Sequence, residues 1–82
     1  MGDRREHDLD ELARRLLHHI QQIQTRGQRL REQLLRLRAI ERSRPLLDAE
    51  TARLREMEAE LAELDAQLRD LEEQLARLRS SD

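Results

Sequence analysis

The apolar residues of this 82-residue chain form two runs in which the spacing alternates between three and four residues, one before Pro45 and one after it. This spacing predicts two α-helices that each bury one stripe of side chains. The runs mirror each other, because facing positions have residue numbers that sum to 91: Leu37/Leu54, Leu34/Met57, Leu30/Leu61, Gly27/Leu64, Ile23/Leu68, Ile20/Leu71, Leu16/Leu75 and Ala13/Leu78. Because helices that run in opposite directions stack in such layers, we predict an all-α fold, an antiparallel two-helix coiled-coil hairpin with these pairs as its intrahairpin core.

Pro45 marks the expected reversal of the chain. It disfavours helical geometry at Arg44 and removes one backbone donor, while Ser43 or Asp48 can cap the helix that follows. We therefore expect a single domain, residues 1–82, with a first helix at about 5–42, a turn at about 43–46 that contains Ser43 and Pro45, and a second helix at about 46–79.

A second topology would satisfy the same pairing. If Pro45 only kinked one long helix, two chains could align antiparallel, and each residue would meet its counterpart in the other chain. An interior proline costs a helix about 3 kcal/mol, which favours the hairpin. The two topologies differ in length, because a hairpin would be about 55 to 60 Å long and an unbroken rod about 115 Å.

The composition agrees with a helical protein. The chain has no aromatic residue, Cys, Val, Asn or Lys, and it consists mainly of good helix formers such as Leu, Arg, Glu and Ala, which excludes a sheet protein. A charged fraction of 41% also fits a disordered chain, but disordered segments lack a sustained apolar period. Without cysteine, there is no disulfide and no thiol chemistry.

The net charge of −2 conceals two blocks of opposite sign. Residues 26–44 hold seven Arg against Glu32 and Glu41, a balance of +5, and residues 45–75 hold ten acidic residues against three Arg, a balance of −7. In a hairpin these blocks would lie side by side and neutralise each other. The expected facing pairs beside the seam are Arg31 with Glu58, Gln24 with Asp65, and Asp10 with Arg79.

Four apolar residues of the first helix fall outside the seam: Leu12, Leu17, Leu35 and Ile40. Each would gain about 1.5 to 3 kcal/mol if it were fully buried, so self-association has a driving force. We predict that they form an interface, and that two hairpins dimerise into a four-helix bundle with the first helix at its centre. Gly27 in the seam either permits close helix approach or is a tolerated defect.

No apolar run approaches the length of a membrane span, and the chain begins with charged residues rather than with a signal sequence. We therefore expect a soluble, cytoplasmic protein with no membrane partner.

The sequence predicts neither an enzyme nor a cofactor site. It contains no glycine-rich phosphate loop and no nucleophile–base constellation, and a two-helix rod encloses no pocket. His7, Glu11 and His18 share one helical face, but metal sites usually offer a pair of histidines four residues apart or a nearby Cys. We expect surface histidines and no metal.

The predicted function is a structural or oligomerisation module that mediates helix–helix interaction with a second copy or with another helical protein. One alternative is nucleic-acid binding by the arginines of residues 26–44, although no aromatic residue can stack a base. The architecture, with a tip at residues 41–48, also resembles coiled-coil hairpins that insert into the secondary channel of RNA polymerase, which implies a role in transcription, but their tip motifs are not matched here. An engineered coiled-coil scaffold is a further alternative.

His19 is the one residue for which we predict a response to pH, because it flanks the seam near Gln74. Histidine ordinarily gains a proton below about pH 6.5, and a new charge there would loosen an interface. Sedimentation of the wild type should show weaker association at pH 5 than at pH 7.5, and a His19→Gln variant should show no such change. Identical pH behaviour of the two proteins would refute the prediction.

Overall fold

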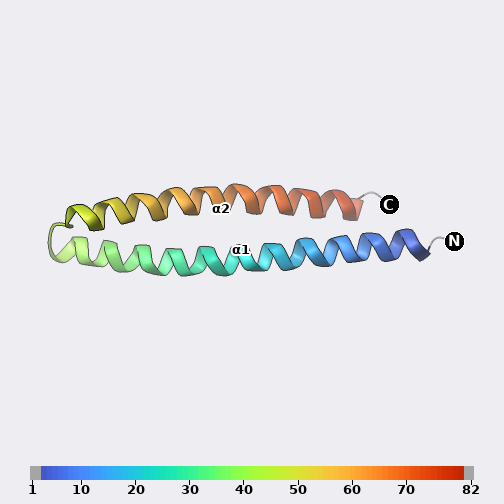
Figure 1. Cartoon of the computed structure of the whole chain (residues 1–82), viewed down its shortest axis with the longest axis horizontal. Coiled ribbons are helices and arrows are strands. Elements are labelled where there is room, and N and C mark those ends of the chain that lie inside the picture. Colours follow the sequence, from blue (N-terminus) through green and yellow to red (C-terminus); the bar gives the residue numbers. More distant parts are fainter. Residues whose placement is uncertain (1–2, 81–82) are drawn as a thin grey trace.

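The chain folds into two long helices that pack side by side and run in opposite directions (Figure 1). A computed structural model describes residues 3–80, with side chains described from residue 8 onward. Helix α1 comprises Asp3–Ser43 and helix α2 comprises Asp48–Ser80. The longest dimension is 66 Å and the other two are 16 and 15 Å. The predicted antiparallel hairpin is therefore confirmed, and the chain pairs its seam within itself.

The second helix begins at Asp48, two residues later than expected. Neither Ser43 nor Asp48 caps it, because the cap is formed by the carboxylate of Glu50, which accepts a hydrogen bond from the Leu47 N–H at 2.9 Å. The Thr51 N–H donates to the Leu47 carbonyl, also at 2.9 Å, and this bond starts the helix. A glutamate three residues after the N-cap is half of a capping box, and it is the sequence signal that could have placed this boundary.

Arg44 connects the end of α1 to the turn and to the start of α2. Its backbone N–H donates to the Ile40 carbonyl at 3.0 Å and so completes the last turn of α1. Its guanidinium binds both carboxylate oxygens of Glu50, at 2.9 and 3.0 Å, and also donates to the Pro45 carbonyl at 3.0 Å. One carboxylate thus holds the end of α1 and the start of α2, and we call Arg44, Glu50 and the Leu47 N–H the turn clasp.

The seam between the helices consists of the residues that the mirrored pairs name. The buried members are Ile20, Ile23, Gly27, Leu37, Leu54, Met57, Leu64 and Leu75. The half-buried members are Ala13, Leu16, Leu30, Leu34, Leu61, Leu68, Leu71 and Leu78. No polar or charged side chain of the described residues is buried with them, so hydrophobic burial is the main interaction between the two helices.

The best-packed part of the seam lies next to the turn, where Leu37, Leu54 and Met57 form a buried cluster. Ile40 and Leu46 pack against this cluster and are half-buried. Ile40 therefore packs within the hairpin, although it lies outside the predicted seam. The reason is that Ile40 follows Leu37 by three residues, which returns it to nearly the same face of α1.

Gly27 does not mediate a close approach of the helices. A Cβ atom at this position would meet only Leu61 Cδ2, at 3.9 Å, which is ordinary van der Waals contact. The backbone of Gly27 has no positive φ angle that would favour glycine. The position therefore has room for a methyl group. Glycine here only lowers the stability of the helix, because it loses more backbone entropy on folding than alanine does.

Replacing Gly27 by alanine should stabilise the hairpin by about 1 kcal/mol, because alanine loses less backbone entropy and its methyl group fits beside Leu61. Urea unfolding followed by circular dichroism measures the change. As a control, Gln28→Ala on the exposed surface of the same turn should change the free energy of unfolding by only a few tenths of a kcal/mol. A destabilised Gly27→Ala variant would show that the helices need the glycine.

The turn clasp should make stability depend on acid pH. The hydrogen bond from Arg44, followed by that from the Leu47 N–H, holds the pKa of Glu50 below its ordinary value. The unfolded chain therefore binds this proton more readily, so the stabilisation is complete above the ordinary pKa and is lost as the pH falls through the lowered one. Glu50→Gln should lower the thermal midpoint by a few degrees at pH 7, and the difference from the wild type should shrink toward pH 3. Glu32→Gln, which removes a carboxylate with no ion pair among the described residues, is the control. A pH-independent difference for Glu50→Gln would contradict the clasp.

Candidate interaction surface

The hairpin has two long sides, which we name from the heptad, with seam positions a and d. The g face consists of the residues that precede each a position: Leu12, His19, Arg26, Gln33 and Ile40 of α1, and Arg53, Glu60, Gln67 and Gln74 of α2. The e face consists of the residues that follow each d position: Asp10, Leu17, Gln24, Arg31 and Arg38 of α1, and Thr51, Glu58, Asp65, Glu72 and Arg79 of α2.

Polar contacts join the two helices along both faces. On the g face, Arg26 binds Glu60, with the Nε atom at 2.8 Å from the carboxylate, and Arg53 donates to Gln33 at 3.4 Å. The e face has two ion pairs, Arg31 with Asp65 at 3.3 Å and Arg38 with Glu58 at 2.7 Å. These exposed pairs each contribute only a few tenths of a kcal/mol and mainly select the register.

The e-face pairs correct the expected partners. Arg31 was expected to face Glu58, but it binds Asp65, one heptad further along α2. In this arrangement Glu58 binds Arg38, so both arginines have a carboxylate partner. The expected pairing would instead place Arg38 beside the uncharged Thr51. Asp65 is therefore not the partner of Gln24, and no ion pair joins Asp10 to Arg79 within the described side chains.

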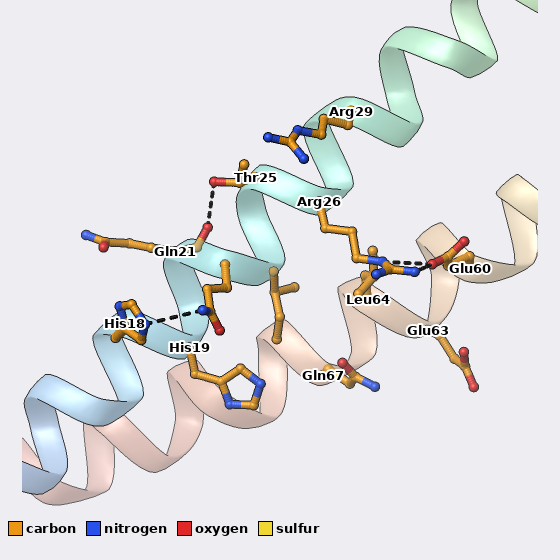
Figure 2. A pocket seen from close by; sticks show the side chains of 12 residues that line it. His18, His19, Gln21, Thr25, Arg26, Arg29, Glu60, Glu63, Leu64 and Gln67 are labelled. Carbon is orange, nitrogen blue, oxygen red and sulfur yellow. Dashed lines mark hydrogen bonds and ion pairs between the residues drawn. The ribbon is translucent and has the colours of Figure 1, made fainter.

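A polar groove of about 770 Å³ lies on the g face at mid-length (Figure 2). Ile23 and Leu64 of the seam line it together with polar side chains, among them His19, Gln67 and the Arg26–Glu60 pair. His19 and Gln67 come from opposite helices and lie close to each other in the view. The groove can therefore accept side chains from a further helix.

A second, smaller groove of about 330 Å³ lies at the open end of the hairpin. Leu12, Leu16 and Leu78 line it together with Gln74 and Arg77. Gln74 thus lines this groove together with Leu12, whereas His19 lines the larger groove together with Gln67.

The histidines do not form a metal site in the described part of the chain. His18 shares a hydrogen bond with Gln22, with 3.3 Å between the His18 Nε2 and Gln22 Nε2 atoms. The carboxylate of Glu11 binds Arg15 at 3.3 Å. The side chain of His7 lies outside the described residues, and no group of three potential ligands occurs among those described.

The exposed leucines are dispersed over the surface. Leu12 is 46% exposed and lies on the g face, Leu17 is 39% exposed and lies on the e face, and Leu35 is 64% exposed and points further outward. Leu47 in the turn, which we did not predict as a surface residue, is 63% exposed. The predicted interface residues Leu12, Leu17, Leu35 and Ile40 therefore do not form one continuous apolar face.

Most arginines of residues 26–44 have an acidic partner. Arg26, Arg31, Arg38 and Arg44 each bind a carboxylate of α2. Four of the seven arginines of this block are therefore neutralised within the hairpin.

Neither described helix has a stretch long and apolar enough to cross a membrane. Comparison of the chain with protein-family models, with curated proteins and with solved structures gives no match. The geometry of the hairpin is therefore the basis for its functional assignment.

Proposed function

We propose that this protein is a structural coiled-coil module that self-associates, with two hairpins forming a four-helix bundle, and that it has no catalytic role. The observation that carries the proposal is the exposed area. The chain exposes 7004 Å², whereas a compact monomer of 9.8 kDa would expose about 5,200 Å². The excess of about 1,800 Å² per chain is more than the roughly 800 Å² that each partner buries in a standard interface.

The packing supports the same proposal. Even the most buried side chain, that of Met57, retains 4% of its exposure, and no described side chain is completely enclosed. Two helices cannot surround a seam layer, so the core leucines stay partly exposed to solvent. A second pair of helices would close these grooves and complete the layers.

The open shape of the grooves also supports a binding role rather than catalysis. Enzyme sites usually enclose their substrate in a concave, largely apolar pocket. Among the described side chains, one ionisable pair has shifted pKa values, Arg44 and Glu50, and this pair holds the turn and lies apart from both grooves. The cytoplasmic location expected from the sequence stays a prediction.

Self-association should appear in the mass and in the stability of the full chain. Sedimentation equilibrium should give twice the chain mass of 9.8 kDa. Because association stabilises the folded state by mass action, a tenfold rise in chain concentration should raise the thermal midpoint by several degrees. A single-chain mass at every concentration, with a constant thermal midpoint, would refute the proposal.

A further inference from the structure

We infer that the second copy covers the g face, with α1 of each chain against α2 of the other and both turns at the same end of the bundle. The inference rests on the proposed self-association. It adds which face of the hairpin the second copy covers, in which direction that copy runs, and which charged residues meet across the interface. Three observations support it: the charge content of the two faces, the partners of the charged residues, and the signs of the residues that would form the new boundary.

The g face is the less charged of the two sides. Six of its nine residues are uncharged, with His neutral: Leu12, His19, Gln33, Ile40, Gln67 and Gln74. On the e face only three of ten are uncharged: Leu17, Gln24 and Thr51. Docking at the g face therefore removes fewer charges from water, which is the main cost of burying such a surface.

The charged residues of the g face already have partners within the hairpin. Arg26 and Glu60 neutralise each other, and Arg53 donates to Gln33. A buried charge is tolerated when it is paired and hydrogen-bonded. The groove of about 770 Å³ also opens on this face, where Ile23 and Leu64 line it, whereas the groove on the e face, lined by Glu72, Leu75 and Arg79, is smaller, at about 460 Å³.

Helix geometry determines which residues would form the boundary between the two hairpins. At 100° per residue, a core that contains positions a, d and g is flanked by e on one side and by c on the other. The e residues already join α1 to α2 within the hairpin, so the c residues would meet the second copy.

The c residues of the two helices carry opposite charges. In the middle of the hairpin they are Gln22, Arg29 and Arg36 of α1, and Glu56, Glu63 and Asp70 of α2. The five charged ones are exposed and have no ion pair among the described residues. The hairpin thus presents a basic row along α1 and an acidic row along α2.

These two rows match when a second copy is turned about the long axis of the hairpin. Arg29 would then face the partner's Glu63, and Arg36 would face the partner's Glu56, since the residue numbers of each pair sum to 92, close to the 91 of the seam. The two-fold axis produces each pair twice. Turning the copy end over end would instead place the basic row against the basic row.

At the open end, one pair of c residues that would face each other across the boundary has the same sign, namely Arg15 and the partner's Arg77. Each of these arginines binds a carboxylate four residues earlier in its own helix, Glu11 and Glu73 respectively, which reduces their repulsion. Docking at the e face would use the b positions as its boundary. These offer one opposite pair, Arg42 with the partner's Asp48, and leave Arg14, Arg55 and Arg69 without an acidic counterpart.

The direction of the two copies can be measured with one spin label per chain. The sequence has no cysteine, so Arg42→Cys, an exposed position beside the turn, gives a single labelling site. With both turns at the same end, the distance between the two labels should lie within about 40 Å, because neighbouring helices are about 10 Å apart. With turns at opposite ends it would be about 60 Å, near the length of a 40-residue helix.

Charge reversal tests the face. Arg29→Glu with Arg36→Glu, and separately Glu56→Arg with Glu63→Arg, should each weaken the homodimer about tenfold or more, because every central boundary pair becomes repulsive. An equal mixture of the two double variants should form a heterodimer with near wild-type affinity, since all its pairs have opposite signs. The matched control is Arg55→Glu with Arg69→Glu, which makes the same change in net charge as the Arg29→Glu, Arg36→Glu variant but on exposed b positions, and it should leave the affinity within about threefold.

The outcomes separate this inference from the proposed function. A dimer with a label distance of about 60 Å, or one weakened by the control variant but not by the c-position variants, would overturn the inference and leave self-association intact. A chain that stays monomeric would overturn both, and a helix of a different protein would then be the occupant to test on the g face.

Discussion

The four residues between the helices, 44–47, determine where every other residue of the hairpin lies. Helix α1 ends at Ser43, Pro45 prevents it from continuing, and helix α2 begins at Asp48. The clasp of Arg44 and Glu50 holds this short connection. A change of one residue in its length would rotate the following helix by about 100° relative to the seam. The leucines of α2 would then lie beside the polar flank of α1. The mirrored layers of the core therefore depend on the turn.

A two-helix hairpin with this seam cannot shield its apolar core completely from water. The apolar stripe is narrow, and each layer is open along both faces, so the core residues are shielded from water only in part. The molecule is consequently 66 Å long and about 16 Å thick, and it exposes more area than a compact domain of its mass. The same openness that limits the stability of a single hairpin provides the surface on which a further pair of helices can pack.

Charged residues next to the seam and charged residues further from it have different roles. Charges next to the seam, such as Arg26 with Glu60 and Arg38 with Glu58, pair within the hairpin and support its register. Charges one step further out, such as Arg29 and Glu63, have no partner among the described residues. The separation of basic and acidic blocks along the chain therefore accounts for contacts inside one hairpin, and it also leaves two rows of opposite sign available for a second one.

The sequence by itself determined the helices, the break at Pro45 and the residues of the seam, because apolar spacing is a local property and the two runs mirror each other. Tertiary structure decided that the two runs pair within one chain. It also decided the finer contacts: Arg31 binds Asp65 instead of Glu58, and Ile40 packs against the buried cluster while Leu47 stays exposed. A long side chain beside the seam can reach either of two residues one heptad apart in the opposite helix. Which one it takes depends on side-chain direction and on competition for each carboxylate, and residue spacing specifies neither.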